Sequence, residues 1–101
     1  MSYQVVIDDE AEQELKDAAH WIAQYAPETA ALWYLDIVEA IQTLQDSPAR
    51  CPLAPESRTF SDEIRHLIFG KYRVLFLIDD NIVWVLRVRH GRQDTLKPKI
   101  R

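Results

Sequence analysis

The chain has 101 residues, of which 48% are hydrophobic and 28% are charged. This length suits a single domain over residues 1–101, and the composition can supply a hydrophobic core without help from a metal ion or a disulfide. Cys51 is the single cysteine, so no internal disulfide can form. The first residues lack a basic segment followed by an apolar run, and no stretch approaches the roughly 20 apolar residues that span a bilayer. We therefore expect a cytoplasmic protein that has no contact with a membrane.

The two parts of the chain carry opposite charge. Residues 1–63 have a net charge of −10 and residues 64–101 a net charge of +6, which leaves −4 overall. Such asymmetry suggests a basic functional face carried on an acidic scaffold. The alternative interpretation is that the helix surfaces of this protein are simply acidic.

The N-terminal part predicts one strand followed by a helix. Residues 3–7 (YQVVI) form a short β-branched run that is typical of a strand. Asp9 and Glu12 have the spacing of a capping box and indicate a helix start. Apolar residues then recur at helical intervals, at Ala11, Leu15, Ala18, Ile22 and Tyr25. Pro27 ends this helix and suits the first turn of another.

A second helix and an irregular connection follow. The second apolar stripe consists of Ala30, Trp33, Ile37, Ile41 and Leu44. Ser47 and Pro48 end this helix, because the residue before a proline disfavours helical geometry. Two helices joined by a short loop fold back as an antiparallel hairpin. Residues 48–62 contain three of the five prolines and show no periodicity, so we expect a loop there.

The last third predicts three strands, over residues 64–69, 72–78 and 82–89. Gly70-Lys71 and Asp79-Asp80-Asn81 separate them at hairpin length, which makes the strands an antiparallel meander. The fold class is therefore α+β: an N-terminal strand, an α-helical hairpin and a three-stranded antiparallel meander, forming one twisted sheet.

Both faces of this sheet have an apolar pattern, although two helices can cover only one of them. One alternation contains Tyr72, Val74, Phe76, Ile78, Ile82, Trp84, Leu86 and Val88. The other contains Leu75, Leu77, Val83 and Val85 together with Arg73, Arg87 and Arg89. The second set predicts an open apolar strip edged by arginines, as in a partner-binding groove. The alternative is that residues 48–62 or the C-terminal tail fold over this strip.

The basic residues of the C-terminal part are expected to meet at one end of the sheet: Arg65, Arg73, Arg87, Arg89, His90 and Arg92. Guanidinium groups suit phosphate or carboxylate, and a histidine of near-neutral pKa suits proton transfer. The cluster therefore allows a phosphate-binding catalytic site, a docking surface for an acidic partner, or solvated charge. His20 is interpreted as a surface residue or a helix–helix contact, and His66 as a residue that packs at a sheet edge. No His, Cys, Asp and Glu residues have metal-ligand spacing, so we expect no metal and no cofactor.

Two segments carry a family resemblance: residues 70–76 (GKYRVLF) and residues 85–94 (VLRVRHGRQD). They resemble the C-terminal half of the RelE/ParE superfamily toxins of type II toxin–antitoxin systems, and are most similar to the ParE and plasmid-stabilisation branch. The resemblance extends over the whole chain. It implies a bacterial toxin that an antitoxin neutralises in a hetero-oligomer, with the C-terminal segment of the antitoxin wrapped over it. If the open strip is a groove, we expect this segment to be amphipathic and acidic at its end.

The resemblance also implies one of two activities. ParE-like members inhibit DNA gyrase without bond-breaking chemistry of their own, whereas RelE-like members cleave mRNA on the ribosome. For the nuclease, Arg73 and Arg92 match basic catalytic positions and His90 is a candidate acid or base. Gln93 replaces a second arginine, and residues 95–101 lack the late tyrosine of those enzymes. A lost cation and a net charge of −4 both disfavour an RNA-bound phosphoryl-transfer site.

We therefore predict a gyrase-inhibiting toxin, with ribosome-dependent mRNA cleavage or a weakly toxic antitoxin-binding protein as alternatives. The predicted partner-binding residues are Arg65, Tyr72, Arg73, Leu75, Leu77, Val83, Val85, Arg87, Arg89, His90 and Arg92.

Overall fold

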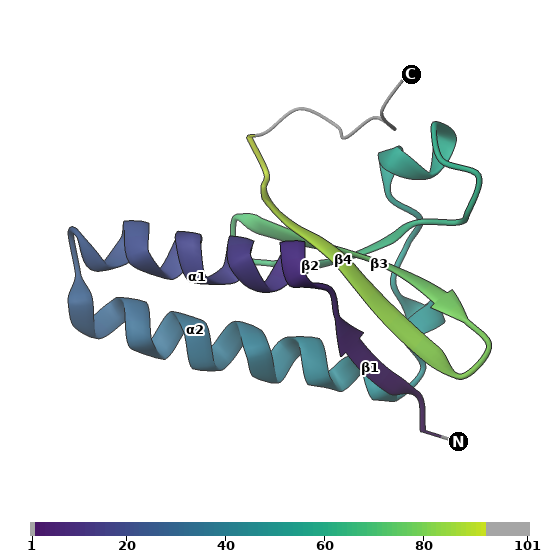
Figure 1. Cartoon of the computed structure of the whole chain (residues 1–101), viewed down its shortest axis with the longest axis horizontal. Coiled ribbons are helices and arrows are strands. Elements are labelled where there is room, and N and C mark those ends of the chain that lie inside the picture. Colours follow the sequence, from purple (N-terminus) through teal and green to yellow (C-terminus); the bar gives the residue numbers. More distant parts are fainter. Residues whose placement is uncertain (1, 93–101) are drawn as a thin grey trace.

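The computed structural model of the chain describes residues 2–92. The main elements are β1 (Gln4–Ile7), α1 (Asp9–Ala23), α2 (Pro27–Gln42), β2 (Arg65–Phe69), β3 (Tyr72–Asp79) and β4 (Ile82–His90). Three short 3-10 turns lie between α2 and β2: η1 (Thr43–Gln45), η2 (Pro48–Arg50) and η3 (Pro55–Arg58). The predicted order of a strand, two helices and three strands is confirmed (Figure 1).

The two helices form an antiparallel hairpin with Pro27 as the first residue of α2, as predicted. The predicted capping box at the start of α1 is wrong. Asp8 is the N-cap residue and no side chain caps the helix, so acidic residues in the first turn complement the helix dipole without that motif. Ala11 and Leu15 are buried, whereas Tyr25 at the other end of the predicted stripe is 75% exposed.

The sheet has the strand order β1-β4-β3-β2. β2, β3 and β4 form the predicted antiparallel meander, and β1 adds to β4 as a parallel strand. The turns between these strands require left-handed backbone, which Gly70 adopts at φ 58° and Asp80 adopts at φ 58°. Sequence reasoning expected β1 in the sheet but did not predict its parallel pairing with the last strand.

The predicted assignment of β4 side chains to the two faces is wrong in the first half of the strand. Asp79 pairs with Ile82, so the β3–β4 turn contains two residues and not the three that the sequence suggested. A difference of one residue exchanges the two faces of a strand. Val83 and Val85 therefore lie opposite Ile78 and Phe76. They are 0% exposed in the core and cannot line an open face as expected.

A β-bulge restores the predicted phase in the second half of β4. Leu75 pairs with Arg87 and Phe76 pairs with Val85, which leaves Leu86 without a partner on β3. One extra residue in a strand shifts all later side chains by one position. Val88 consequently returns to the core, while Trp84 and Leu86 lie on the side of the sheet that carries Leu75 and Leu77.

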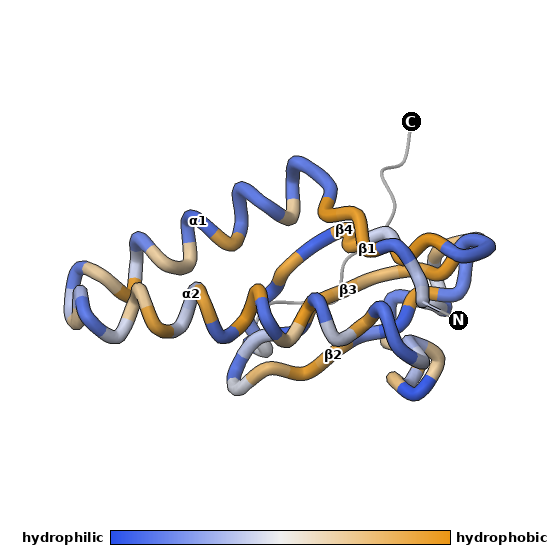
Figure 2. Tube along the Cα trace, turned by 90° about the horizontal axis from the view of Figure 1, so that it is seen from below, coloured by the Kyte–Doolittle hydropathy of each residue, from blue (hydrophilic) through white to orange (hydrophobic). Residues whose placement is uncertain are grey.

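The helical hairpin covers one face of the sheet. Ala11 and Leu15 of α1 and Ile37 and Ile41 of α2 pack there against core residues of β3 and β4, including Phe76. Figure 2 shows α1 as the more hydrophilic of the two helices, with the hydrophobic segments gathered in α2 and the strands. Within residues 2–92, no helix is long and apolar enough to cross a membrane.

The connection between α2 and β2 covers part of the opposite face, which we call the open face. Ala54 and Ile64 form a second buried cluster there with Leu75 of β3, and the half-buried Leu77 and Leu86 pack against it. Both alternatives for this face are therefore partly right. Residues 48–62 cover the part near Leu75, and an apolar part remains accessible beside it. The expected role of the C-terminal tail lies outside the described residues.

Candidate functional site

The structure distributes the predicted partner-binding residues over both faces of the sheet. Cross-strand partners share a face, so Arg73 and its partner Arg89 lie on the open face with Leu75 and Leu77. The helix-covered face instead carries Tyr72, Val83, Val85 and His90. Of the basic residues expected to meet at one end of the sheet, Arg73 and Arg89 are paired there on the open face. The neighbouring His90 points to the helix-covered face, because strand pleating alternates side-chain directions.

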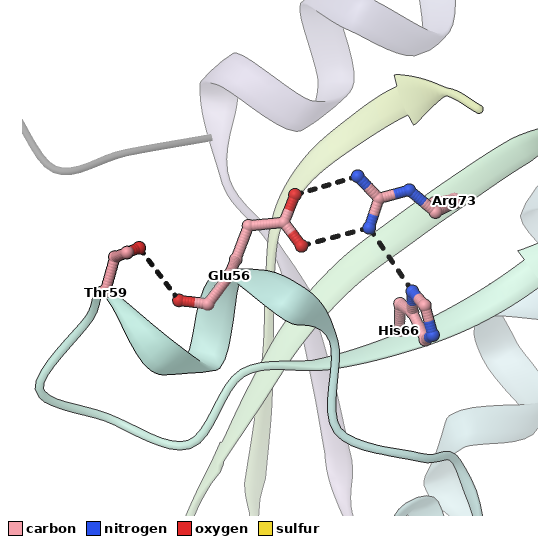
Figure 3. Close-up of polar contacts among 4 residues, drawn as sticks. All are labelled: Glu56, Thr59, His66 and Arg73. Carbon is pink, nitrogen blue, oxygen red and sulfur yellow. Dashed lines mark hydrogen bonds and ion pairs between the residues drawn. The ribbon is translucent and has the colours of Figure 1, made fainter. Parts of the chain in front are cut away.

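Arg73 is held by a buried carboxylate of the covering connection (Figure 3). Its Nη1 and Nη2 donate to Oε1 and Oε2 of Glu56 at 3.0 and 2.8 Å. The Glu56 side chain is 1% exposed and that of Arg73 is 13% exposed. The hydrogen bonds that Arg73 donates to this carboxylate raise the pKa of Arg73. The pair fixes the turn Pro55–Arg58 to the sheet and neutralises the guanidinium.

His66 on β2 completes this group. Arg73 Nη1 lies 3.3 Å from His66 Nδ1, and because a guanidinium can only donate, Nδ1 must be the acceptor. Burial, with a further contribution from the Arg73 charge, lowers the pKa of His66. The lowered pKa favours the neutral imidazole, and His66 lies half-buried on the edge strand β2.

Arg87 is held by the first helix. Its Nε and Nη2 donate to Oε1 and Oε2 of Glu14 at 3.0 and 2.8 Å, and Glu10 lies 3.7 Å from Nη1. These hydrogen bonds raise the pKa of Arg87. Glu14 Oε1 also accepts the backbone N–H of Val88 at 2.9 Å, an amide of β4 beyond the end of β1. Glu14 thus pairs one cation and protects a strand edge.

Arg65 is also committed to the fold. Its Nη1 donates to the carbonyl oxygen of Cys51 at 2.7 Å and lies 3.4 Å from that of Ala49. The Glu63 carboxylate is 4.0 Å from Nη2. This arginine therefore ties the start of the connection to β2 and is not presented to a ligand.

Tyr72 and His90 form an aromatic contact with the second helix. The centroid of the Tyr72 ring lies 5.0 Å from that of Trp33 and 5.2 Å from that of His90. Burial raises the pKa of Tyr72. The backbone N–H of Arg92 donates to His90 Nδ1 at 3.1 Å. Arg92 is exposed, and Gln93 and the residues after it lie outside the described part of the chain.

The accessible part of the open face is a hollow of about 490 Å³, which we call the acidic hollow. Its apolar floor and acidic rim are made by Asp62, Glu63, Leu77, Ile78, Asp79, Trp84 and Leu86. Sequence reasoning included Leu77 but assigned Trp84 and Leu86 to the other face. It also missed Glu14 and Glu56, since nothing in the sequence distinguishes these carboxylates from other acidic surface residues.

A second accessible surface lies on the helical hairpin, away from the acidic hollow. Four large apolar side chains there are more than half exposed: Trp21, Tyr25, Leu32 and Leu35. Lys16, His20, Leu35 and several alanines of both helices border a shallow groove of about 580 Å³. Groups of three or more metal-ligating side chains are absent from residues 2–92.

Solved structures of toxin–antitoxin systems share the fold of the chain. A structure described as the chromosomal ParDE toxin–antitoxin system from P. aeruginosa is similar at a TM-score of 0.72 and 20% identity, over 88% of this chain and 96% of that chain. The RelBE2 complex from Mycobacterium tuberculosis is similar at a TM-score of 0.59 and 28% identity, over 89% and 99%. The archaeal RelE–RelB complex from Pyrococcus horikoshii OT3 is similar at a TM-score of 0.57 and 20% identity, over 92% and 100%.

Curated protein sequences give no match to the chain. The model of a protein family does match, over residues 5–95, and this family is described as the ParE toxin of the type II toxin–antitoxin system parDE. The match includes every helix and all but the first residue of the strands. The chain therefore belongs to the ParE toxin family of type II toxin–antitoxin systems.

Proposed function

We propose that this toxin inhibits DNA gyrase and is neutralised by a cognate antitoxin, and that it breaks no bond itself. The observation that carries the choice of target is the ion pair between Glu56 and Arg73. Arg73 is the cation that a RelE-like nuclease would use at this position, and here a 1% exposed carboxylate already occupies both of its terminal nitrogens.

Phosphoryl transfer on RNA requires cations that are free to stabilise the charge of the transition state. In this chain Glu56 neutralises Arg73, and Glu14 neutralises Arg87. His90 and the exposed Arg92 remain as groups for the alternative, ribosome-dependent cleavage of mRNA. Two of the arginines on the last strands are therefore unavailable for that chemistry, so gyrase is the favoured target.

The antitoxin is proposed from the complexes that share this fold. The similar structures from P. aeruginosa, M. tuberculosis and P. horikoshii are described as toxin–antitoxin systems or complexes. An accessible apolar region beside a polar rim is the kind of surface that a protein partner covers, and the acidic hollow provides one.

The test compares two purified targets. We expect the chain to block supercoiling of relaxed plasmid DNA by gyrase, and we expect equimolar antitoxin, mixed with the chain beforehand, to restore supercoiling. A ribosomal translation reaction with the same protein should leave mRNA intact. Unaffected gyrase together with codon-phased mRNA cuts would refute the proposal.

Two variants make the comparison sharper. Under the nuclease alternative, His90→Gln removes an acid–base group and Glu56→Gln releases Arg73, so mRNA cleavage should fall in the first variant and rise in the second. Under the proposed function both variants leave mRNA intact. The matched control is Glu39→Gln, a neutralised carboxylate on the exposed surface of α2.

A further inference from the structure

We propose that the acidic hollow docks a basic, apolar segment of the antitoxin, with a lysine or arginine side chain lying over Trp84 and its charge at the carboxylate rim. The proposal rests on the proposed neutralisation by an antitoxin and adds the chemistry of the segment that binds here. It differs from the sequence-based expectation of an acidic partner segment at an arginine-edged strip.

The floor of the hollow is a fixed apolar surface. Leu77 and Leu86 pack against the buried cluster of Ala54, Ile64 and Leu75, so they stay in place without a partner. Trp84 lies opposite Leu77 on the neighbouring strand. The two-residue turn and the bulge at Leu86 together place these three side chains on the open face, where they line the hollow.

The rim of the hollow is negatively charged. Asp62 and Glu63 come from the end of the connection, and Asp79 ends β3. All three are exposed, and the one ion pair that the described residues give to them is the 4.0 Å contact of Glu63 with Arg65. The carboxylates are therefore available to a cation from outside.

Two arginines of the last strands do not counter this rim, because the fold already pairs them. Arg73 and Arg87 are each paired through two hydrogen bonds with a carboxylate of their own fold. A docking segment at the hollow thus meets three exposed carboxylates, whereas Arg73 and Arg87 are already paired within the fold. Charge complementarity selects a cationic segment.

Lysine and arginine fit this combination of floor and rim. Their aliphatic stems pack along apolar surface while the charged end remains near water, and a cation over an indole ring gains further attraction. An acidic segment would place its negative charge beside three carboxylates. A purely apolar segment would leave these carboxylates without a partner.

The test measures the affinity of the full chain for the protein encoded beside its gene, by titration calorimetry at two salt concentrations. We expect the triple variant Asp62→Asn/Glu63→Gln/Asp79→Asn to bind about tenfold more weakly, since each exposed pair contributes a factor of about two. Its affinity should also depend less on salt than that of the wild type.

The matched control is Glu28→Gln/Asp36→Asn/Glu39→Gln, which removes the same charge from exposed positions of α2. We expect this control to bind within about twofold of the wild type, because long-range charge effects are screened. Equal loss in both triple variants would overturn the docking site in favour of a general charge effect, and no loss in the rim variant would overturn it directly.

Two further outcomes are distinguishable. Absence of any binding by the wild-type chain would refute the proposed neutralisation itself, whereas tight binding with an unaffected rim variant refutes the docking site alone. The chain also has cations at Lys97 and Lys99. Tighter antitoxin binding by Lys97→Gln/Lys99→Gln would show that the chain's own segment competes for the hollow, and would overturn the partner as its occupant.

Discussion

Replacing Glu56 by glutamine tests whether the connection is fastened to the sheet by a buried ion pair. The substitution keeps the shape of the side chain but removes the charge that two terminal nitrogens of Arg73 contact. Removal of one partner from a buried pair costs about 3–5 kcal/mol because the other charge remains desolvated. Arg73 keeps a small exposure of 13%, so we expect the lower end, about 3 kcal/mol.

This loss is measurable by urea unfolding followed through tryptophan fluorescence and circular dichroism. For a domain of about 100 residues, a loss of about 3 kcal/mol corresponds to a fall in Tm of roughly 12 to 24 °C. The control is Glu63→Gln, because this carboxylate is 75% exposed and 4.0 Å from Arg65, and it should change stability by less than about 0.5 kcal/mol.

A double variant separates the charge from the packing. Glu56→Leu/Arg73→Met removes both charges and fills the space with apolar atoms, so its stability should lie closer to the wild type than that of Glu56→Gln. If Glu56→Gln unfolds within about 1 kcal/mol of the wild type, the pair does not fasten the connection and the argument is refuted.

Three further predictions concern single residues. Val85→Asp should give an insoluble or unfolded chain, because it places a charge in the helix-covered core. Leu77→Asp should stay folded, as measured by circular dichroism. Equal solubility of the two variants would contradict the assignment of Val85 and Leu77 to opposite faces. Folding keeps the pKa of His66 below its unfolded value, so its contribution to stability is present above the unfolded pKa and is lost as the pH falls through the folded pKa. Between pH 7 and pH 5 the wild type should therefore lose more unfolding free energy than His66→Gln. Equal losses in the two proteins over this range would contradict the prediction. Burial raises the pKa of the Cys51 thiol. Its reaction with a thiol reagent at pH 7.5 should therefore be about tenfold or more slower in the folded chain than in urea. Equal rates would mean that Cys51 is accessible to the reagent in the folded chain.

The sequence was sufficient for the order and type of the elements. Hydrophobic periodicity identifies a helix or strand from neighbouring residues alone, which is why the stripe from Ala30 to Leu44 and the meander after Ile64 were predicted nearly at their observed bounds. Pro27 marked the start of α2 for the same reason, because the preference of proline for a first turn is local. The family resemblance rested on segments that the family match includes.

Which side chains of β4 face the helices depended on how β3 and β4 pair, and the sequence alone does not show this pairing. Asp79-Asp80-Asn81 allows a turn of two or three residues, and the difference decides whether Val85 or Trp84 faces the helices. The bulge at Leu86 then changes the phase again. Counting alternate residues along the strand could not reveal either event, since both are properties of two strands together.

The site was decided by tertiary contacts alone. Glu56 is 17 residues from Arg73, and Glu14 is 73 residues from Arg87, so no local pattern links them. The sequence determined that arginines would lie on the last strands. The fold determined that carboxylates neutralise two of them and that three exposed carboxylates line the accessible hollow. The physical reason is that charge acts through space, and only the packed chain brings these side chains within hydrogen-bonding distance.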